Sequence, residues 1–221
     1  MQKIMFTDRY GLTKAVVEGR KTNTRRLINP MPKDCAAIHK GCWGADWSDK
    51  PMTLVVDRDT GGIYCKYCGN GVRLYDGGYH YKTKYKVGEV VAVAQSYEQI
   101  GCFWDTVVSE IDNHKCARSH RGWHNKMFVK AELMPHQIQI TGVRCERLQD
   151  ISDEDCLKEG INASNSHEIG YGIPWVYEFA GSKMVYYTPR EAFAALIDKV
   201  SGRGTWGLNP WVVVYEFQLV K

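Results

Sequence analysis

The chain changes from helix to strand within the segment Gly19-Arg20-Lys21-Thr22-Asn23-Thr24-Arg25-Arg26. Upstream, Thr7 or Asp8 can cap a helix that runs to about Glu18. Gly19 stands where a glycine commonly follows a helix, because glycine adopts the left-handed conformation that such an end requires. The threonines of the segment are β-branched and favour extended chain, so the sequence predicts a strand over Thr22–Leu27.

Other elements follow on both sides of this segment. Apolar or alternating patterns predict strands over Lys3–Phe6, Gly88–Ala94, Gln137–Arg147 (with a kink at Gly142) and Trp211–Leu219. Capping residues predict two helices, one from Ser152 to about Gly160 and one beginning at Thr188. The second helix has a predicted core face of Ala192, Phe193, Leu196, Ile197 and Val200. Strands scattered among short helices, without regular strand–helix–strand alternation, indicate an α+β fold on a mixed or antiparallel β-barrel.

The length of 221 residues suits one domain with insertions, so we expect a single domain over 1–221. Residues 30–86 are dense in proline, glycine, cysteine and tyrosine, which predicts a loop-rich insertion. Residues 101–126 and 162–187 are predicted to be smaller insertions of the same irregular kind, the latter a long loop or a hairpin.

Composition is that of an ordinary globular protein, with 44% apolar and 24% charged residues. Lys and Arg number 29 against 25 Asp and Glu, and the net charge of +4 permits a polyanionic partner without requiring one. No apolar stretch approaches the length of a membrane span, and the first residues lack a signal-peptide pattern. We therefore expect a cytoplasmic protein without a membrane partner, in which the eight cysteines stay reduced as core residues or metal ligands.

Four cations lie within seven residues of the Gly19–Arg26 segment. On extended chain, Arg20, Thr22, Thr24 and Arg26 share one face, and Lys21, Asn23 and Arg25 share the other. Three interpretations stay open: a solvated basic strand, an anion site for phosphate, and a catalytic site. In the third, Lys21 crowded by arginines would have the lowered pKa that a base needs to activate the hydroxyl of Thr24.

The same segment resembles the signature of the ASCH family, which belongs to the PUA-like superfamily of β-barrels. The signature is glycine, any residue, lysine, two of any, glutamate, any, arginine, and Gly19, Lys21 and Arg26 match it. Thr24 stands where many members have glutamate. That substitution resembles the N(4)-acetylcytidine amidohydrolases of the family, and the resemblance implies Lys21, Thr24 and Glu159 as catalytic residues.

The chain is also similar to longer ASCH proteins of phages and prophages. The similarity lies in Glu18–Leu27, Val143–Ser152 and the Trp206–Phe217 ending, together with Lys86–Ala94. It implies one cleft that binds RNA or a nucleotide, and the implied ligand-binding residues are Gly19, Arg20, Arg25, Arg26, Trp206, Asn209 and Trp211. The longer members usually carry Arg-Glu where this chain has Ala94-Gln95.

A cysteine cluster in the 30–86 insertion suggests a structural zinc site. Cys65 and Cys68 form a Cys-x-x-Cys pair followed by glycine, and Cys35 with Cys42 could complete a set of four ligands, with His39 as an alternate. Zinc would order a glycine-rich insertion that has no core of its own. The alternative is scattered thiols. No organic cofactor is expected.

Three functions remain open on the sequence. The first is an RNA- or nucleotide-binding ASCH protein of phage or prophage type, which uses the cations of the segment and a Tyr/Lys stripe over Tyr79–Lys86. The second is an amidohydrolase acting on an acylated nucleoside. The third is a phage accessory protein that binds a protein partner.

Overall fold

The structure is a computed structural model, and it describes residues 1–28, 53–66, 81–100, 121–165 and 175–220. The fold is α+β, as the sequence predicts, with one mixed sheet, two small hairpins and short helices. Within the described ranges, no helix combines the length and the apolar character needed to cross a membrane.

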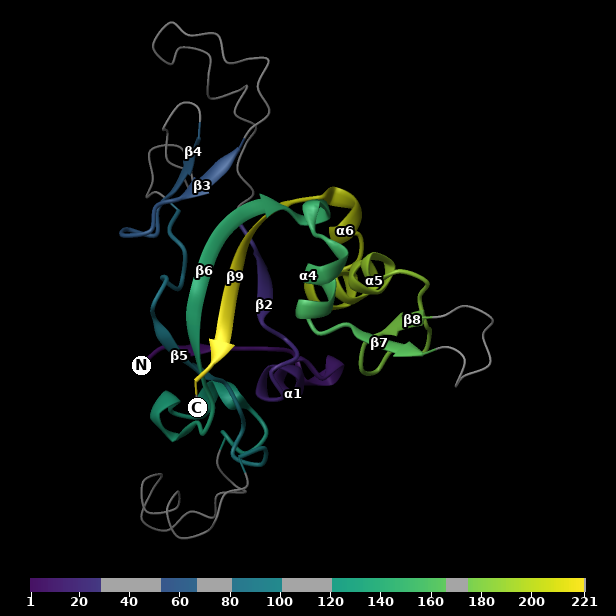
Figure 1. Cartoon of the computed structure of the whole chain (residues 1–221). Coiled ribbons are helices and arrows are strands. Elements are labelled where there is room, and N and C mark those ends of the chain that lie inside the picture. Colours follow the sequence, from purple (N-terminus) through teal and green to yellow (C-terminus); the bar gives the residue numbers. More distant parts are fainter. Residues whose placement is uncertain (29–52, 67–80, 101–120, 166–174, 221) are drawn as a thin grey trace, which may run out of the picture.

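The central sheet has five strands in the order β1-β5-β6-β9-β2. These strands are β1 (Lys3–Ile4), β5 (Val90–Val93), β6 (Gln137–Arg147), β9 (Trp211–Leu219) and β2 (Asn23–Leu27). Strand β1 pairs in parallel with β5, and every other pairing in the sheet is antiparallel. Strands β6 and β9 form a long curved pair against which β2 lies (Figure 1). The kink predicted at Gly142 is a register shift between Ile140 and Gly142.

The predicted barrel is not closed by the described strands, and this part of the fold prediction is corrected. Strands β1 and β2 form the two edges of the sheet, with no ladder between them. Because β1 has only two residues, it offers little backbone for a ladder. A side chain links the edges instead: the Arg26 guanidinium of β2 donates a hydrogen bond to the carbonyl oxygen of Met5, just after β1.

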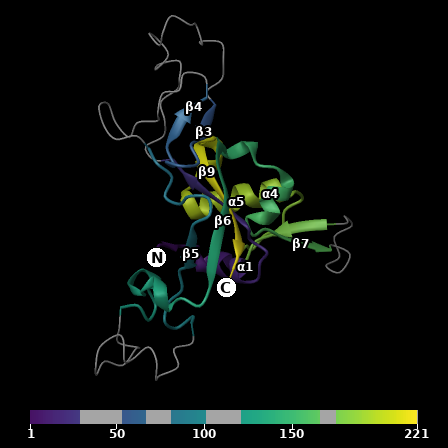
Figure 2. The same ribbon diagram turned by 60° about the vertical axis from the view of Figure 1, so that its left-hand side comes forward.

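Helices α4 (Asp153–Lys158), α5 (Pro189–Ser201) and α6 (Thr205–Leu208) lie together beside β2 and β9 in both ribbon views (Figures 1 and 2). Helix α1 (Leu12–Val17) leads into β2. Two hairpins lie outside the central sheet: β3 (Leu54–Val56) with β4 (Ile63–Cys65), and β7 (Asn162–Asn165) with β8 (Trp175–Glu178). Short 3₁₀ helices cover Asp8–Tyr10, Lys126–Phe128, Ala131–Leu133 and Leu148–Asp150.

The predicted starts of α4 and α5 are confirmed. The Ser152 side chain accepts a hydrogen bond from the Asp155 N–H at the start of α4. Thr188 and Glu191 form a complete capping box at the start of α5. The predicted core face of α5 is also confirmed, except that Val200 is 38% exposed near the helix end.

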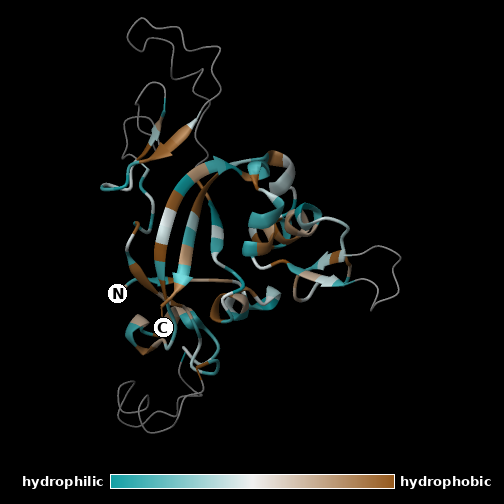
Figure 3. Ribbon diagram, in the orientation of Figure 1, coloured by the Kyte–Doolittle hydropathy of each residue, from teal (hydrophilic) through white to brown (hydrophobic). Residues whose placement is uncertain are grey.

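The central sheet has two chemically different faces, which Figure 3 shows as alternating colours along the strands. The first, here called the helix face, carries Asn23, Arg25, Arg144, Glu146 and Glu216. The second, here called the aromatic face, carries Thr24, Arg26, Tyr215 and Phe217. The strand-pair register fixes this division, because cross-strand partners point to the same side.

Gly19 gives a test of how the chain enters β2. Its φ of +71° is left-handed, and an added Cβ would meet nothing within 4 Å, so only backbone strain opposes a side chain there. We expect Gly19→Ala to lower the free energy of unfolding by about 1–2 kcal/mol in urea titrations. Gly207→Ala in α6, which also has open space, is the control and should not destabilise. Equal effects of the two changes would contradict this account.

Candidate functional site

Lys21 is buried at the point where the chain enters β2. Its backbone N–H donates to the carbonyl oxygen of Ala15, 2.9 Å away, which ties the turn to α1. Its Nζ lies 2.5 Å from Oε2 of Glu159 and 2.8 Å from the Glu159 carbonyl oxygen. Only 1% of the Lys21 side chain and 6% of the Glu159 side chain are exposed. A buried ammonium therefore meets a buried carboxylate.

Glu159 reaches this position because α4 ends there. Glu159 is the C-cap of α4, and Gly160, with φ +102°, turns the chain away. The Thr22 N–H donates to the carbonyl oxygen of Lys158, 2.9 Å away, and so joins the entry of β2 to the end of α4. The structure thus brings together Lys21 and Glu159, two predicted site residues that are 138 positions apart.

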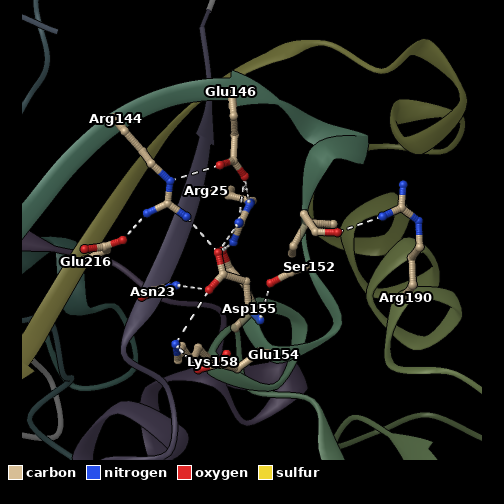
Figure 4. A network of polar contacts seen from close by, with 12 residues as sticks. Asn23, Arg25, Arg144, Glu146, Ser152, Glu154, Asp155, Lys158, Arg190 and Glu216 are labelled. Atoms are coloured by element: carbon tan, nitrogen blue, oxygen red, sulfur yellow. Dashed lines mark hydrogen bonds and ion pairs between the residues drawn. The ribbon is translucent and has the colours of Figure 1, made fainter. Parts of the chain in front are cut away.

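Arg25 connects Glu159 to the rest of the helix face. Its NH1 donates to Oε1 of Glu159 at 3.0 Å, and its NH2 donates to Oδ2 of Asp155 at 2.9 Å. Its Nε donates to Oε1 of Glu146 at 2.8 Å. The Arg25 side chain is 1% exposed. Three acidic partners therefore hold this guanidinium inside the protein. Figure 4 shows Glu146 and Asp155 beside Arg25.

Sequence reasoning missed most of this acidic network. Arg144 lies beside Arg25 and contacts Asp155 at 2.7 Å, Glu146 at 3.0 Å and Glu216 (Figure 4). The spacing of Arg144 and Glu146 was a usable signal, because residues two apart on a strand share a face. Arginines buried on one face of a sheet need acidic partners on that face.

The pKa of Lys21 is lowered from its ordinary value. Burial is the main cause, and the charges of Arg26 and Arg25 act in the same direction. The Glu159 carboxylate opposes this effect by its charge and its hydrogen bond. Burial alone would favour the neutral amine, so Glu159 is the group that favours the protonated amine.

Arg25 and Asp155 form an ion pair in which both groups favour their charged forms. Burial acts against both charges, but Glu159 and Glu146 raise the pKa of Arg25 above its ordinary value. Burial would also raise the pKa of Asp155, yet hydrogen bonding to Arg25 and the charge of Arg144 hold it below its ordinary value. Both groups are therefore charged at neutral pH.

Thr24 lies on the aromatic face, beside its cross-strand partner Tyr215, and is 5% exposed. Arg26, two residues further on, lies 5.7 Å from the centre of the Phe6 ring. Lys21 Nζ lies 5.8 Å from the centre of the same ring. Lys21 therefore stands at the edge of the sheet, where it contacts the helix face through Glu159 and approaches the face that carries Thr24.

The remaining predicted ligand-binding residues are more dispersed. Arg20 is 44% exposed and donates to Glu18, at distances of 2.6 and 3.0 Å, and to Asn162. Trp206, Asn209 and Trp211 lie near the opposite end of β2, since Ile28 N–H donates to the Trp211 carbonyl oxygen. Four residues of strand, roughly 13 Å, separate the Asn23 and Leu27 ends of β2. The structure therefore does not place the Trp206–Trp211 segment beside Lys21.

The zinc prediction rests mostly on residues outside the described ranges. Cys65 is buried in β4, whereas Cys35, His39, Cys42 and Cys68 lie in parts of the chain that the structure does not describe. Among described residues, no group of three or more His, Cys, Asp or Glu could hold a metal ion. Zinc stays a prediction.

The site thus joins a buried lysine to the carboxylate that holds it, and the strand that Lys21 leads into carries the hydroxyl of Thr24. This arrangement can support proton transfer at a site from which water is excluded. The chain matches no known protein-family model, no curated protein and no solved structure.

Proposed function

We propose that this protein is an amidohydrolase that removes an acyl group from a modified nucleoside such as N(4)-acetylcytidine. The observation that carries the proposal is the buried contact between Lys21 Nζ and Glu159 Oε2 at 2.5 Å. The ASCH resemblance assigns these two residues, together with Thr24, to amide cleavage. A lysine with a lowered pKa beside an orienting carboxylate is the environment that a catalytic base needs.

In this mechanism the neutral Lys21 amine takes the proton of the Thr24 hydroxyl, and the Thr24 oxygen bonds to the acyl carbonyl carbon. The C–N bond then breaks, and the leaving nitrogen takes the proton from the Lys21 ammonium. Water attacks the resulting threonyl ester by the same route, which releases the carboxylic acid and restores Thr24. Arg26, on the strand face of Thr24, is the cation that stabilises the oxyanion.

The finer fold assignment belongs to the same proposal. We assign the domain to the ASCH type of the PUA-like superfamily, with the curved β6–β9 pair as part of its barrel. The side-chain link from Arg26 to Met5, which joins the two sheet edges, supports this assignment.

The burial of the cations favours catalysis over simple phosphate binding. A lysine that binds phosphate is protonated and within reach of solvent, whereas Lys21 is buried against Glu159. Arg25 is likewise neutralised by Glu146, Asp155 and Glu159. A phosphate would have to displace these carboxylates before it could contact either cation.

A deacylation screen tests the proposal. Purified protein is incubated with a panel of acetylated nucleosides, and release of the parent nucleoside is followed by chromatography. Wild type should deacylate at least one member of the panel. Thr24→Val, which keeps the shape but removes the hydroxyl, should not, whereas Thr22→Val should be active. Wild-type inactivity on the whole panel, or full activity of Thr24→Val, would count against the proposal.

A second candidate, RNA binding, is favoured by a row of exposed lysines next to the aromatic face. Lys82, Lys84 and Lys86 are exposed, and they alternate with the buried residues Thr83 and Tyr85. The Lys84 N–H donates to the Tyr215 hydroxyl at 2.9 Å, which places the row beside the cross-strand partner of Thr24. Such a row can follow a phosphate backbone while a base approaches the aromatic face.

Replacing these three lysines with alanine should weaken binding of a fluorescent single-stranded RNA and reduce the slope of log K against log salt by about 2. The reason is that a protein with fewer phosphate contacts releases fewer counterions from the RNA when it binds. The control replaces Lys158 of α4, Lys183 after β8 and Lys199 of α5, and so removes the same charge outside the lysine row. An identical salt slope in both triple variants and wild type would rule out the lysine row as the RNA contact.

A further inference from the structure

Gln95 carries a buried polar atom that the fold itself does not satisfy. The residue is 8% exposed, and its Oε1 has no hydrogen-bond partner among the described residues. A buried carbonyl oxygen without a donor costs free energy, so proteins rarely retain one without a use. The residue lies two positions after the end of β5.

Extending the β1–β5 register beyond the ends of the two strands puts Gln95 on the same side as Phe6. In the parallel β1–β5 pair, Ile4 is the partner of Val93, and the Ala94 N–H donates to the Ile4 carbonyl oxygen. Two residues further along both chains, Gln95 corresponds to Phe6 and should point to the same side. Met5 and Ala94 point the other way, because they belong to a separate hydrophobic cluster that excludes Phe6.

Phe6 is the ring that two cations of the site approach. Lys21 Nζ and the Arg26 guanidinium carbon lie 5.8 and 5.7 Å from its centre. Phe217 lies 5.8 Å from Phe6, ring centre to ring centre. Burial raises the pKa of Tyr85 to about 12, and the nearby charge of Arg26 acts against that rise, which places Tyr85 in the same neighbourhood. These surroundings of aromatic rings and cations suit a planar heterocycle.

We propose that Gln95 is a specificity-determining residue, whose side-chain Oε1 accepts a hydrogen bond from an N–H group of the substrate base. The inference rests on the proposed function for the identity of the substrate, and on the unpartnered oxygen for the contact. The ligand class is a planar nitrogen heterocycle that presents an N–H donor, such as a pyrimidine bearing an amino or acylamino group. A site with such an acceptor rejects bases that lack the donor.

The test uses the full-length protein and two probes, N(4)-acetylcytidine for hydrolysis and cytidine for binding by calorimetry. Gln95→Leu keeps the approximate volume but removes the acceptor. We expect KM for N(4)-acetylcytidine and Kd for cytidine to rise about 10- to 100-fold, with a smaller change in kcat. The melting temperature should not fall, because leucine relieves an unsatisfied buried oxygen. Gln218→Leu, at an exposed glutamine of β9, is the matched control and should match wild type.

The outcomes separate this inference from the proposed function. If wild type binds cytidine but hydrolyses nothing, and Gln95→Leu loses the binding, Gln95 is confirmed as a ligand contact and the amidohydrolase proposal fails. If wild type hydrolyses the substrate and Gln95→Leu has the same KM and Kd, the Gln95 inference fails alone. A lower melting temperature with unchanged KM and Kd would assign Gln95 a structural role. If wild type neither binds nor hydrolyses these probes, both proposals fail.

Discussion

Replacing Lys21 with arginine is expected to lower kcat for acyl-nucleoside hydrolysis by about 10²- to 10⁴-fold, the usual contribution of a positioned base. Arginine keeps the positive charge that Glu159 requires, but its guanidinium cannot give up a proton near neutral pH. The measurement is steady-state hydrolysis together with calorimetric binding of the product nucleoside. The control is Lys158→Arg. Lys158 is the last residue of α4 and pairs with Glu154 at the surface.

Each result of this substitution has a distinct meaning. A Lys21→Arg variant that binds the nucleoside but has lost hydrolysis supports the base assignment. Retained hydrolysis would refute it. If wild type is inactive and the variant binds as well as its parent, the protein is better described as a binding module in which Thr24 contacts the ligand by hydrogen bonding.

Replacing Arg25 with methionine is expected to lower the free energy of unfolding at pH 7 by about 3–5 kcal/mol. The change removes the cation shared by the buried Glu159 and the partly buried Glu146 and Asp155. Urea unfolding measures the effect. The control is Arg20→Met, which removes a half-exposed guanidinium paired with Glu18 and should cost less than about 1 kcal/mol.

The pH dependence provides a second check on Arg25. The pKa of Asp155 is lowered in the folded protein, so its ion pairs stabilise the fold above the unfolded pKa, and this stability is lost as pH falls through the folded pKa. Without Arg25 the pKa of Asp155 is lowered less. The carboxylate then takes up a proton more readily as the pH falls, and protonation removes its unpaired charge. The difference between Arg25→Met and wild type should therefore be larger at pH 7 than near pH 4. A deficit independent of pH would mean that Arg25 contributes by packing alone.

Local patterns predicted the strands that build the site. Strand β9 has the predicted bounds, and β6 runs over the predicted range with its irregularity next to Gly142, because alternation and β-branched residues report strand geometry directly. The N-terminal helix differs from its prediction: Asp8–Tyr10 is a 3₁₀ helix, and Gly11 interrupts it with φ +65°. A Cβ on Gly11 would lie 2.8 Å from Cβ of Ala180, a tertiary contact that no local pattern contains.

The site itself was only partly predictable. Glu159 was assigned to the site by the family resemblance, and it does contact Lys21. The other carboxylates required knowledge of which strands pair, since Glu146 faces Arg25 only through the β2-β9-β6 order of the sheet. The same register separates Trp211 from Lys21. The family resemblance implied one cleft for all of these residues. A comparison of motifs carries no information about how far apart the residues lie along the strands.

The pH profile of kcat/KM for N(4)-acetylcytidine, measured for wild type and Glu159→Gln, tests the central claim most directly. If Lys21 is the base and Glu159 favours its protonated form, removing the carboxylate charge lowers the pKa of Lys21 further. The acidic limb of the profile should then move to lower pH, with activity retained above it. An acidic limb that stays in place, or an absence of hydrolysis by wild type at any pH, would contradict the account.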